Sequence, residues 1–97
     1  MQQIGNWTNK DTDKLFEAVL KLKTIEECEL FFRDLLTLAE IKEVSSRFKV
    51  ARMLAQKNKT YLQIAKEAQT TTATVTRIAH WFKYGMGGYK MILQRIK

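Results

Sequence analysis

The segment from residue 60 to residue 82, TYLQIAKEAQTTTATVTRIAHWF, limits the fold more than any other part of this chain. It contains two short stretches with apolar residues at helical spacing, separated by a short polar turn. The apolar positions expected to pack the two helices together are Ile64, Ala65 and Ala68 in the first and Val75, Ile78 and Ala79 in the second. The small Ala65 lets two crossing helices approach closely, as a helix-turn-helix requires.

The positions left outward form a polar face whose shape suits the major groove of DNA. The residues expected nearest to the bases are Thr70, Thr71, Thr72, Ala73, Thr76 and Arg77. Threonine methyls and Ala73 can contact a thymine methyl, and hydroxyls can bond bases directly or through water. One threonine, Thr70 or Thr71, is also expected to cap the helix. Arg77 has three open interpretations, which are a DNA contact, packing on Trp81, or a pair with a neighbouring subunit.

Charge is divided sharply between the two halves of the chain. Residues 1–46 carry six Lys/Arg against nine Asp/Glu, whereas residues 47–97 carry eleven Lys/Arg against Glu67 alone. Such segregation is expected when one end of a molecule approaches phosphates, although a merely solvated basic surface is the alternative. The residues expected to contact phosphates, which fix register without reading sequence, are Arg52, Lys57, Lys59, Lys66, His80 and Lys83.

The signals for helices are unusually clear, and none favours a strand. The chain has no proline, the residue that most often breaks helices. Boxes of the form Thr-x-x-Glu/Gln, which cap helix starts, begin at Thr24, Thr37 and Thr60. The helix after Thr37 is expected to be the longest and to end near Gln56, with Asn58 as a left-handed cap. Together with three further helices, the pattern predicts six helices in an all-α fold.

The first and last helices are expected at about residues 10–22 and 89–96, and the helix-turn-helix at about residues 60–83. We expect residues 10–97 to form a single helical domain that carries both DNA binding and dimerisation. Residues 1–9 are expected to be a flexible arm.

Composition argues against several other classes of function. Apolar runs are short and interrupted by charge, so no membrane span is expected. The first eleven residues lack the basic-then-apolar pattern of a secretory signal. The single cysteine, Cys28, suits a reducing cytoplasm and is expected to be a small buried hydrophobe. With one histidine, one cysteine and no paired carboxylates, we expect no metal site, no cofactor and no enzymatic activity.

The number of large apolar residues predicts a homodimer. Six short amphipathic helices leave more apolar surface than a chain of 97 residues buries comfortably. The two N-terminal helices, which carry Phe16, Phe31 and Phe32, are expected to bury their apolar surface against a second copy. A symmetric dimer would also set two recognition helices roughly 34 Å apart, one turn of DNA, and so read a palindrome.

Two blocks of the chain resemble the tryptophan-repressor-like (TrpR-like) family, in particular its YerC/YecD branch. DLLTLAEIKEVSSRFKVARML, residues 34–54, resembles the family's LLT-x-x-E block followed by a long helix. ATVTR, residues 73–77, resembles its recognition helix, A-T-[IV]-T-R. The resemblance runs from about Phe31 to the end. It implies six helices per subunit in an interlaced dimer, with the fourth and fifth as the helix-turn-helix, and a cytoplasmic regulator of transcription that binds operator DNA, most simply as a repressor.

The resemblance also allows the family's corepressor site to be compared residue by residue. Where the founding member binds L-tryptophan, this chain keeps Thr37 and two arginines, Arg47 and Arg77, which would flank the indole ring. Ile78 matches a glycine that makes room for the ring, and Trp81 matches a serine that helps to hold the amino group. Because both replacements add bulk, we expect the cleft to be filled and free tryptophan not to bind.

The turn of the helix-turn-helix departs from the common pattern. Many such turns begin with a glycine, because that residue adopts a positive φ. Here the residue is Gln69, for which a left-handed backbone costs roughly 1 kcal/mol.

Two other functions remain open at this point. In the first, the chain is a regulator that responds to a small effector other than tryptophan, bound near Thr37 and Arg47. In the second, it is an accessory module that docks on a protein through its acidic half.

The C-terminal aromatic residues also have two interpretations, because they can stack on single-stranded bases or belong to the core. Their helical spacing beside Ile78 favours the core for Trp81, Phe82, Tyr84 and Tyr89.

Overall fold

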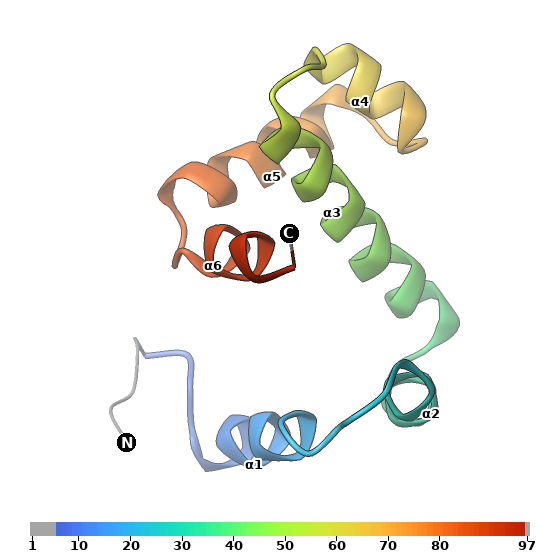
Figure 1. Ribbon diagram of the computed structural model, residues 1–97, viewed down its shortest axis with the longest axis vertical. Helices are drawn as coiled ribbons and strands as arrows, with labels where there is room; N and C mark the ends of the chain where they lie inside the picture. The colour runs from blue at the N-terminus through green and yellow to red at the C-terminus, as the bar shows by residue number, and fades with distance from the viewer. Residues whose placement is uncertain (1–5, 97) are drawn as a thin grey trace. The chain divides into compact units, whose positions relative to one another are not determined.

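The computed structural model describes residues 6–96, and this part of the chain contains six α-helices and no strand, as the sequence predicts (Figure 1). The helices are α1 (Lys10–Val19), α2 (Ile25–Leu35), α3 (Leu38–Gln56), α4 (Tyr61–Glu67), α5 (Thr72–Tyr84) and α6 (Gly88–Arg95). Most of the expected N-terminal arm, residues 1–5 of 1–9, lies outside the described residues. None of the described helices is long and apolar enough to cross a membrane.

The capping boxes start helices largely where the sequence places them. At α4 the box is complete, because the Thr60 hydroxyl accepts from the Gln63 amide at 3.1 Å and the Gln63 side chain accepts from the Thr60 amide at 2.8 Å. At α2 it is shifted by one residue. The Thr24 hydroxyl accepts from the Glu27 amide at 3.1 Å, but the Glu27 carboxylate accepts from the Lys23 amide at 2.8 Å. Both arrangements satisfy amides that a helix leaves without an internal partner.

Two helices end in a left-handed residue, and neither of these residues is glycine. After α3 the left-handed residue is Lys57, with φ of 59°, so the expectation of Asn58 was wrong by one position. After α4 it is Gln69, with φ of 55°, as the turn requires. There the Thr70 amide donates to the Ala65 carbonyl at 2.9 Å and the Gln69 amide donates to the Lys66 carbonyl at 3.3 Å. This pair of hydrogen bonds is the Schellman motif, which satisfies the last carbonyls of a helix.

The chain divides into two compact units, residues 1–38 and 39–97, and among the described residues the core lies in the second. Its fully packed members come from α3, α4 and α5 and are Val50, Ala51, Met53, Ile64, Ala65, Val75 and Ile78. Leu54, Ala68, Phe82 and Tyr89 are partly buried against them. Two apolar residues of α3, Val44 and Ala55, are exposed although their helical spacing would suit a buried face. In one chain only the C-terminal turns of α3 are covered, so Val50 and Met53, which the sequence did not single out, form the buried stripe.

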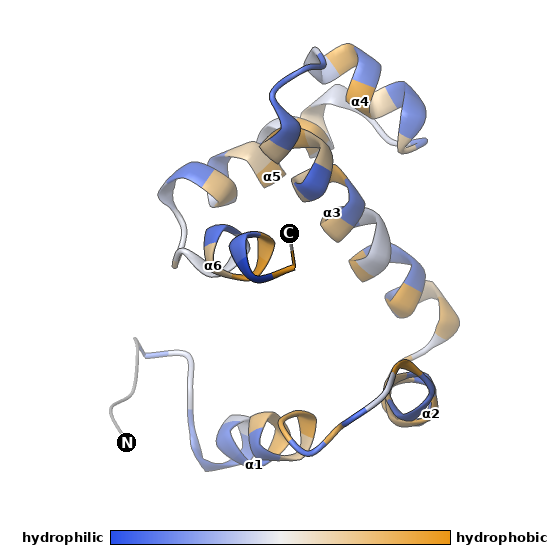
Figure 2. Cartoon of the chain, in the orientation of Figure 1, coloured by the Kyte–Doolittle hydropathy of each residue, from blue (hydrophilic) through white to orange (hydrophobic). Residues whose placement is uncertain are grey.

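The first unit holds α1 and α2, and neither helix has a buried residue. Large apolar side chains on these helices and the loop between them are open to solvent: Phe16, Leu20, Ile25, Leu30 and Leu35. Figure 2 shows the apolar turns of both helices in orange. Local ring contacts join Trp7 to Phe16 at 6.2 Å and Phe31 to Phe32 at 5.4 Å between centroids. Cys28, expected to be buried, is a free thiol that is only partly covered.

Candidate nucleic-acid interface

The helix-turn-helix is formed by α4, the turn at residues 68–71, and α5. The side chains between its two helices are apolar and buried. Val75 is fully buried, while Ile64 and Ala65 keep only 1% and 4% of their surface exposed. Ile78 and Ala79 are buried on the same side of α5, at 5% and 4%. The two helices contact each other, and Ile64, Ala65, Val75 and Ile78 belong to one buried cluster, so the apolar positions predicted from spacing lie where the pair packs.

The opposite edge of α5 is open to solvent at its N-terminal end. The exposed residues there are Thr71, Thr72, Ala73, Thr76 and Arg77, while Thr70 is partly buried. The Thr71 hydroxyl accepts from the Thr74 amide at 3.1 Å, so Thr71 is the cap and not Thr70. The Thr76 hydroxyl donates to the Thr72 carbonyl at 2.9 Å. A threonine-tipped edge therefore projects from a helix whose other side is fixed to the core.

The predicted phosphate-binding residues lie on α3, the α3–α4 loop, α4 and α5. Arg52 is exposed, with its guanidinium 5.5 Å from the centroid of the Phe48 ring, and Lys66 is exposed on α4. His80 is exposed on α5, with its ring 5.2 Å from that of Tyr84. These three side chains all belong to the second compact unit.

Three of the predicted phosphate contacts meet around one hollow of about 380 Å³. Lys57, Lys59 and Lys83 line it together with Lys90 of α6, a lysine that the sequence analysis did not select. Leu54, Tyr61, Ala79 and Phe82 form its remaining lining. Lys90 was missed because nothing in its local sequence indicates that α6 lies beside the end of α3.

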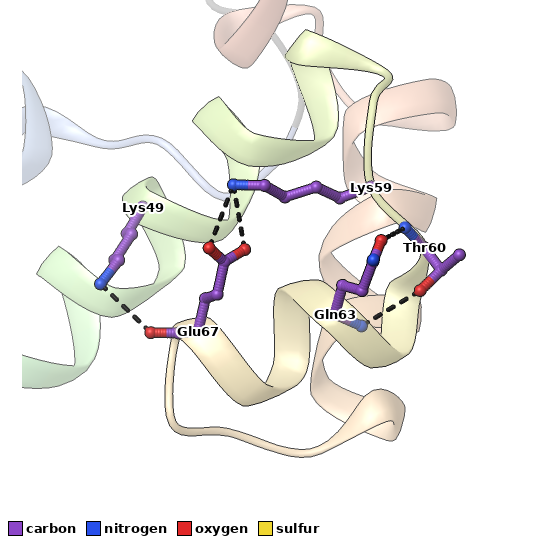
Figure 3. Close-up of polar contacts among 5 residues, drawn as sticks. All are labelled: Lys49, Lys59, Thr60, Gln63 and Glu67. Carbon is purple, nitrogen blue, oxygen red and sulfur yellow. Dashed lines mark hydrogen bonds and ion pairs between the residues drawn. The ribbon is translucent and has the colours of Figure 1, made fainter.

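Lys59 differs from the other predicted phosphate contacts because its charge already has a partner. Its ammonium lies 2.9 Å and 3.2 Å from the two carboxylate oxygens of Glu67. In addition, the Lys49 ammonium donates to the Glu67 backbone carbonyl at 3.3 Å. Figure 3 shows both lysines converging on this residue at the end of α4.

A second hollow, of about 560 Å³, contains most of the predicted effector residues. Arg47, Arg77, Ile78 and Trp81 line it, together with Met86, Gly88 and Tyr89. Trp81 is 58% exposed and Tyr84 75%, so these two rings are not part of the buried core that their helical spacing favoured. Arg47 is held by the Glu43 carboxylate, 2.8 Å away on the preceding turn. Thr37 belongs to the other compact unit, and it precedes α3 directly.

Among the described residues, no group of three or more His, Cys, Asp or Glu side chains is placed to hold a metal ion.

Comparison with known proteins agrees with this geometry. Residues 10–97 match the family described as Trp repressor protein. The chain belongs to this family. The TrpR-like chain is 43% identical over 95 residues to the YerC protein of Bacillus subtilis, a match that covers 98% of this chain and 90% of YerC. This relationship confirms the predicted YerC branch. The family is one of repressor proteins and not of enzymes.

Solved structures of TrpR-like proteins confirm the fold. A TrpR-like protein from Eubacterium eligens superposes with a TM-score of 0.85 at 39% identity, over 91% of this chain and 90% of that one. A candidate Trp repressor from Staphylococcus aureus superposes with a TM-score of 0.86 at 40% identity, over 92% and 88%. The all-α TrpR-like fold predicted from the sequence is thus shared over nearly the whole chain.

Proposed function

We propose that this TrpR-like chain is a sequence-specific, double-stranded-DNA-binding regulator of transcription that acts as a homodimer, most simply as a cytoplasmic repressor that occupies its operator. The observation that carries the proposal is the two-sided nature of α5. One side is locked by Val75 and Ile78, and the other presents exposed threonines. A helix fixed in this way can enter a major groove without rearranging its own core.

In the proposed complex Thr72, Ala73 and Thr76 approach base edges, and Thr70, Thr71 and Arg77 lie beside them. The chain offers hydroxyls and methyls here and few charges, which suits contacts to thymine methyls and readout through ordered water. Water-mediated base contacts are the mode described for the Trp repressor, the founding member of the family. Phosphates are met by Arg52, Lys57, Lys66, His80 and Lys83, with Lys59 joining them once its carboxylate partner is displaced.

The dimer is proposed from uncovered apolar surface. Leu20, Ile25 and Leu30 are 82%, 79% and 71% exposed in one chain. Exposure of this extent on consecutive helices is unusual for a monomer, because contiguous apolar patches mark interaction surfaces. A second copy that covers α1 and α2 would bury them and would pair the two α5 helices for a palindrome.

Selection from a pool of random DNA duplexes at a fixed salt concentration tests the proposal. We expect an enriched palindrome whose half-sites are one helical turn apart. Substitution of Thr72 and Thr76 by alanine should relax the selected motif, whereas substitution of the solvent-exposed Glu26 in α2 should leave it unchanged. Recovery of no motif, together with binding to a protein column through the acidic half, would instead favour the docking module.

Gating by a small effector is a second candidate, and the hollow of about 560 Å³ favours it. Two arginines, Arg47 and Arg77, line this hollow, and Ile78 and Trp81 stand where the family's corepressor would need space. We propose that free L-tryptophan does not bind there, because Ile78 and Trp81 replace the glycine and the serine that accommodate this ligand in the founding member. Isothermal titration calorimetry with L-tryptophan should show no saturable heat, and a ligand-dependent rise in melting temperature with another carboxylate would identify a different effector.

A further inference from the structure

Glu67 is the single acidic residue in the basic half of the chain, residues 47–97, where it stands among eleven lysines and arginines. It is also the last residue of α4, inside the helix-turn-helix. A carboxylate at the C-terminal end of a helix faces the negative end of the helix dipole, which is an unfavourable position for an anion. Helix stability therefore does not explain this residue, and its contacts must.

The carboxylate of Glu67 holds the ammonium of Lys59 between its two oxygens, at 2.9 Å and 3.2 Å (Figure 3). The pair is tertiary and not helical, because Lys59 comes from the loop before α4. The Lys59 side chain keeps only 29% of its surface exposed, against 49% for Glu67. Lys59 is thus folded against the protein, and its charge is neutralised by the Glu67 carboxylate.

We propose that Glu67 is a brake on sequence-independent DNA affinity, because it withholds Lys59 from phosphates until a correctly seated duplex displaces it. This inference rests on the proposed DNA-binding function and adds a determinant of specificity to it. Non-specific binding arises from the cations that neutralise phosphates, so removal of one cation lowers it directly. A specific complex is affected less, because close phosphates compete with the carboxylate for Lys59. The pair is partly open to solvent, which weakens it enough for phosphates to exchange with the carboxylate.

The test uses the full chain in three variants and a DNA duplex of random sequence. Glu67→Gln keeps the shape of the side chain and frees Lys59, so we expect tighter binding to random duplex. The slope of log K against log salt should steepen by about 0.9 for each additional phosphate contacted. Glu43→Gln is the matched control, because it also removes one acid and frees one exposed cation, Arg47, at 2.8 Å. It should change the affinity much less than Glu67→Gln does.

The third variant assigns the effect to Lys59. In the double variant Lys59→Gln, Glu67→Gln the gain in affinity should disappear. If the gain persists in that background, or if Glu43→Gln produces the same gain, general charge and not the Lys59 pair is responsible and the proposal is wrong. If Glu67→Gln binds DNA more weakly and melts at a lower temperature, the ion pair serves to hold the loop against the helix. That result would also overturn the proposal.

Failure of this inference is distinguishable from failure of the proposed function. If the unmodified protein binds no duplex at low salt, the function itself is wrong. If it binds and selects a motif, while Glu67→Gln leaves the ratio of specific to random affinity unchanged, only the brake is wrong. We expect that ratio to fall in Glu67→Gln.

Discussion

Two backbone positions show how single residues set the geometry of the proposed DNA-binding unit. Gln69 adopts a φ of 55° and Lys57 a φ of 59°, a region that costs most side chains roughly 1–2 kcal/mol. At Gln69 the two Schellman hydrogen bonds and the buried Ala65 offset this cost. The turn between α4 and α5 is therefore specified by the surrounding contacts and not by the preference of its own residue.

Gln69→Gly should stabilise the protein, because glycine adopts the left-handed conformation without the steric cost. We expect an increase of about 0.5–1 kcal/mol in the free energy of unfolding, since the gain is reduced by the greater freedom of glycine in the unfolded chain. Urea denaturation of the variant and the parent measures it. The control, Lys66→Gly within α4, should lose about 0.5–1 kcal/mol. Equal losses in both variants would contradict the argument.

Gly85 is required for space, because a Cβ at this position would lie 2.4 Å from the Trp81 carbonyl oxygen and 2.9 Å from its ring atom Cε3. Gly85→Ala should therefore lower the free energy of unfolding by about 1–3 kcal/mol, the usual range for overpacking. Gly88→Ala is the control, since nothing lies within 4 Å of a Cβ there, and its stability should be unchanged or slightly higher. Thermal denaturation measures both variants, and an equal change in the melting temperatures of Gly85→Ala and Gly88→Ala would contradict this prediction.

At the level of elements, the N-terminus of α5 combines a cap with the proposed reading edge. Thr71 caps the helix through its hydroxyl, while Thr72 keeps its side chain in solvent. Neighbouring threonines thus have separable roles, one in stability and one in recognition.

Thr71→Ala should destabilise the protein by about 1 kcal/mol, the typical cost of a lost cap. Thr71→Ser, which keeps the hydroxyl, should be close to the parent. Thr72→Ala should leave stability within about 0.5 kcal/mol, as expected for a surface substitution, and weaken binding to the selected operator. Chemical denaturation and an operator titration on the same samples separate the two effects. Loss of stability in Thr72→Ala as large as in Thr71→Ala would show that both residues cap the helix.

The elements themselves were predictable where local chemistry decides them. Capping at Thr60 and the spacing of Ile64, Val75 and Ile78 are encoded within a few residues, so α4, α5 and their buried faces were predicted correctly. The buried stripe of α3 was predictable only in part, at Ala51 and not at Val50 or Met53, because only the last turns of this helix are covered and its sequence is apolar on several sides. The left-handed residue Lys57 also lacks a sequence signal.

Contacts between distant residues were the least predictable part of the candidate site. The pair between Lys59 and Glu67 joins a loop to the far end of a helix, and no spacing rule connects them. Lys90 reaches the lysine-lined hollow through the position of α6. The sequence selected the right basic region, but only the fold indicates which cations are free and which are already paired.

At the scale of the whole molecule, charge and apolar surface are separated along the chain. Residues 1–46 have a net charge of −3 and residues 47–97 one of +10. The buried core belongs to the second unit, and α1 and α2, described helices with no buried residue, belong to the first. This division supports a molecule in which one unit binds DNA and the other meets a second copy.

Affinity for operator DNA should consequently depend strongly on salt. If the dimer neutralises roughly six to ten phosphates, the affinity should fall by about 10³–10⁵-fold between 50 and 200 mM salt. Fluorescence anisotropy at several salt concentrations gives the slope. Lys66→Gln should reduce that slope without changing the selected motif, because phosphate contacts carry no sequence information. A response to salt that is nearly flat would remove the electrostatic part of the proposal.

Among the described residues, every buried side chain lies between Val50 and Ala79. This has a consequence for local unfolding. Amide protons of α4 and α5 should exchange with solvent deuterium most slowly, at rates that do not vary with protein concentration, because a single chain supplies their protection. Amides of α1 and α2 should exchange quickly in dilute samples and slow down as concentration rises. The part of the molecule proposed to meet the double helix would then keep its form even while protomers part and rejoin.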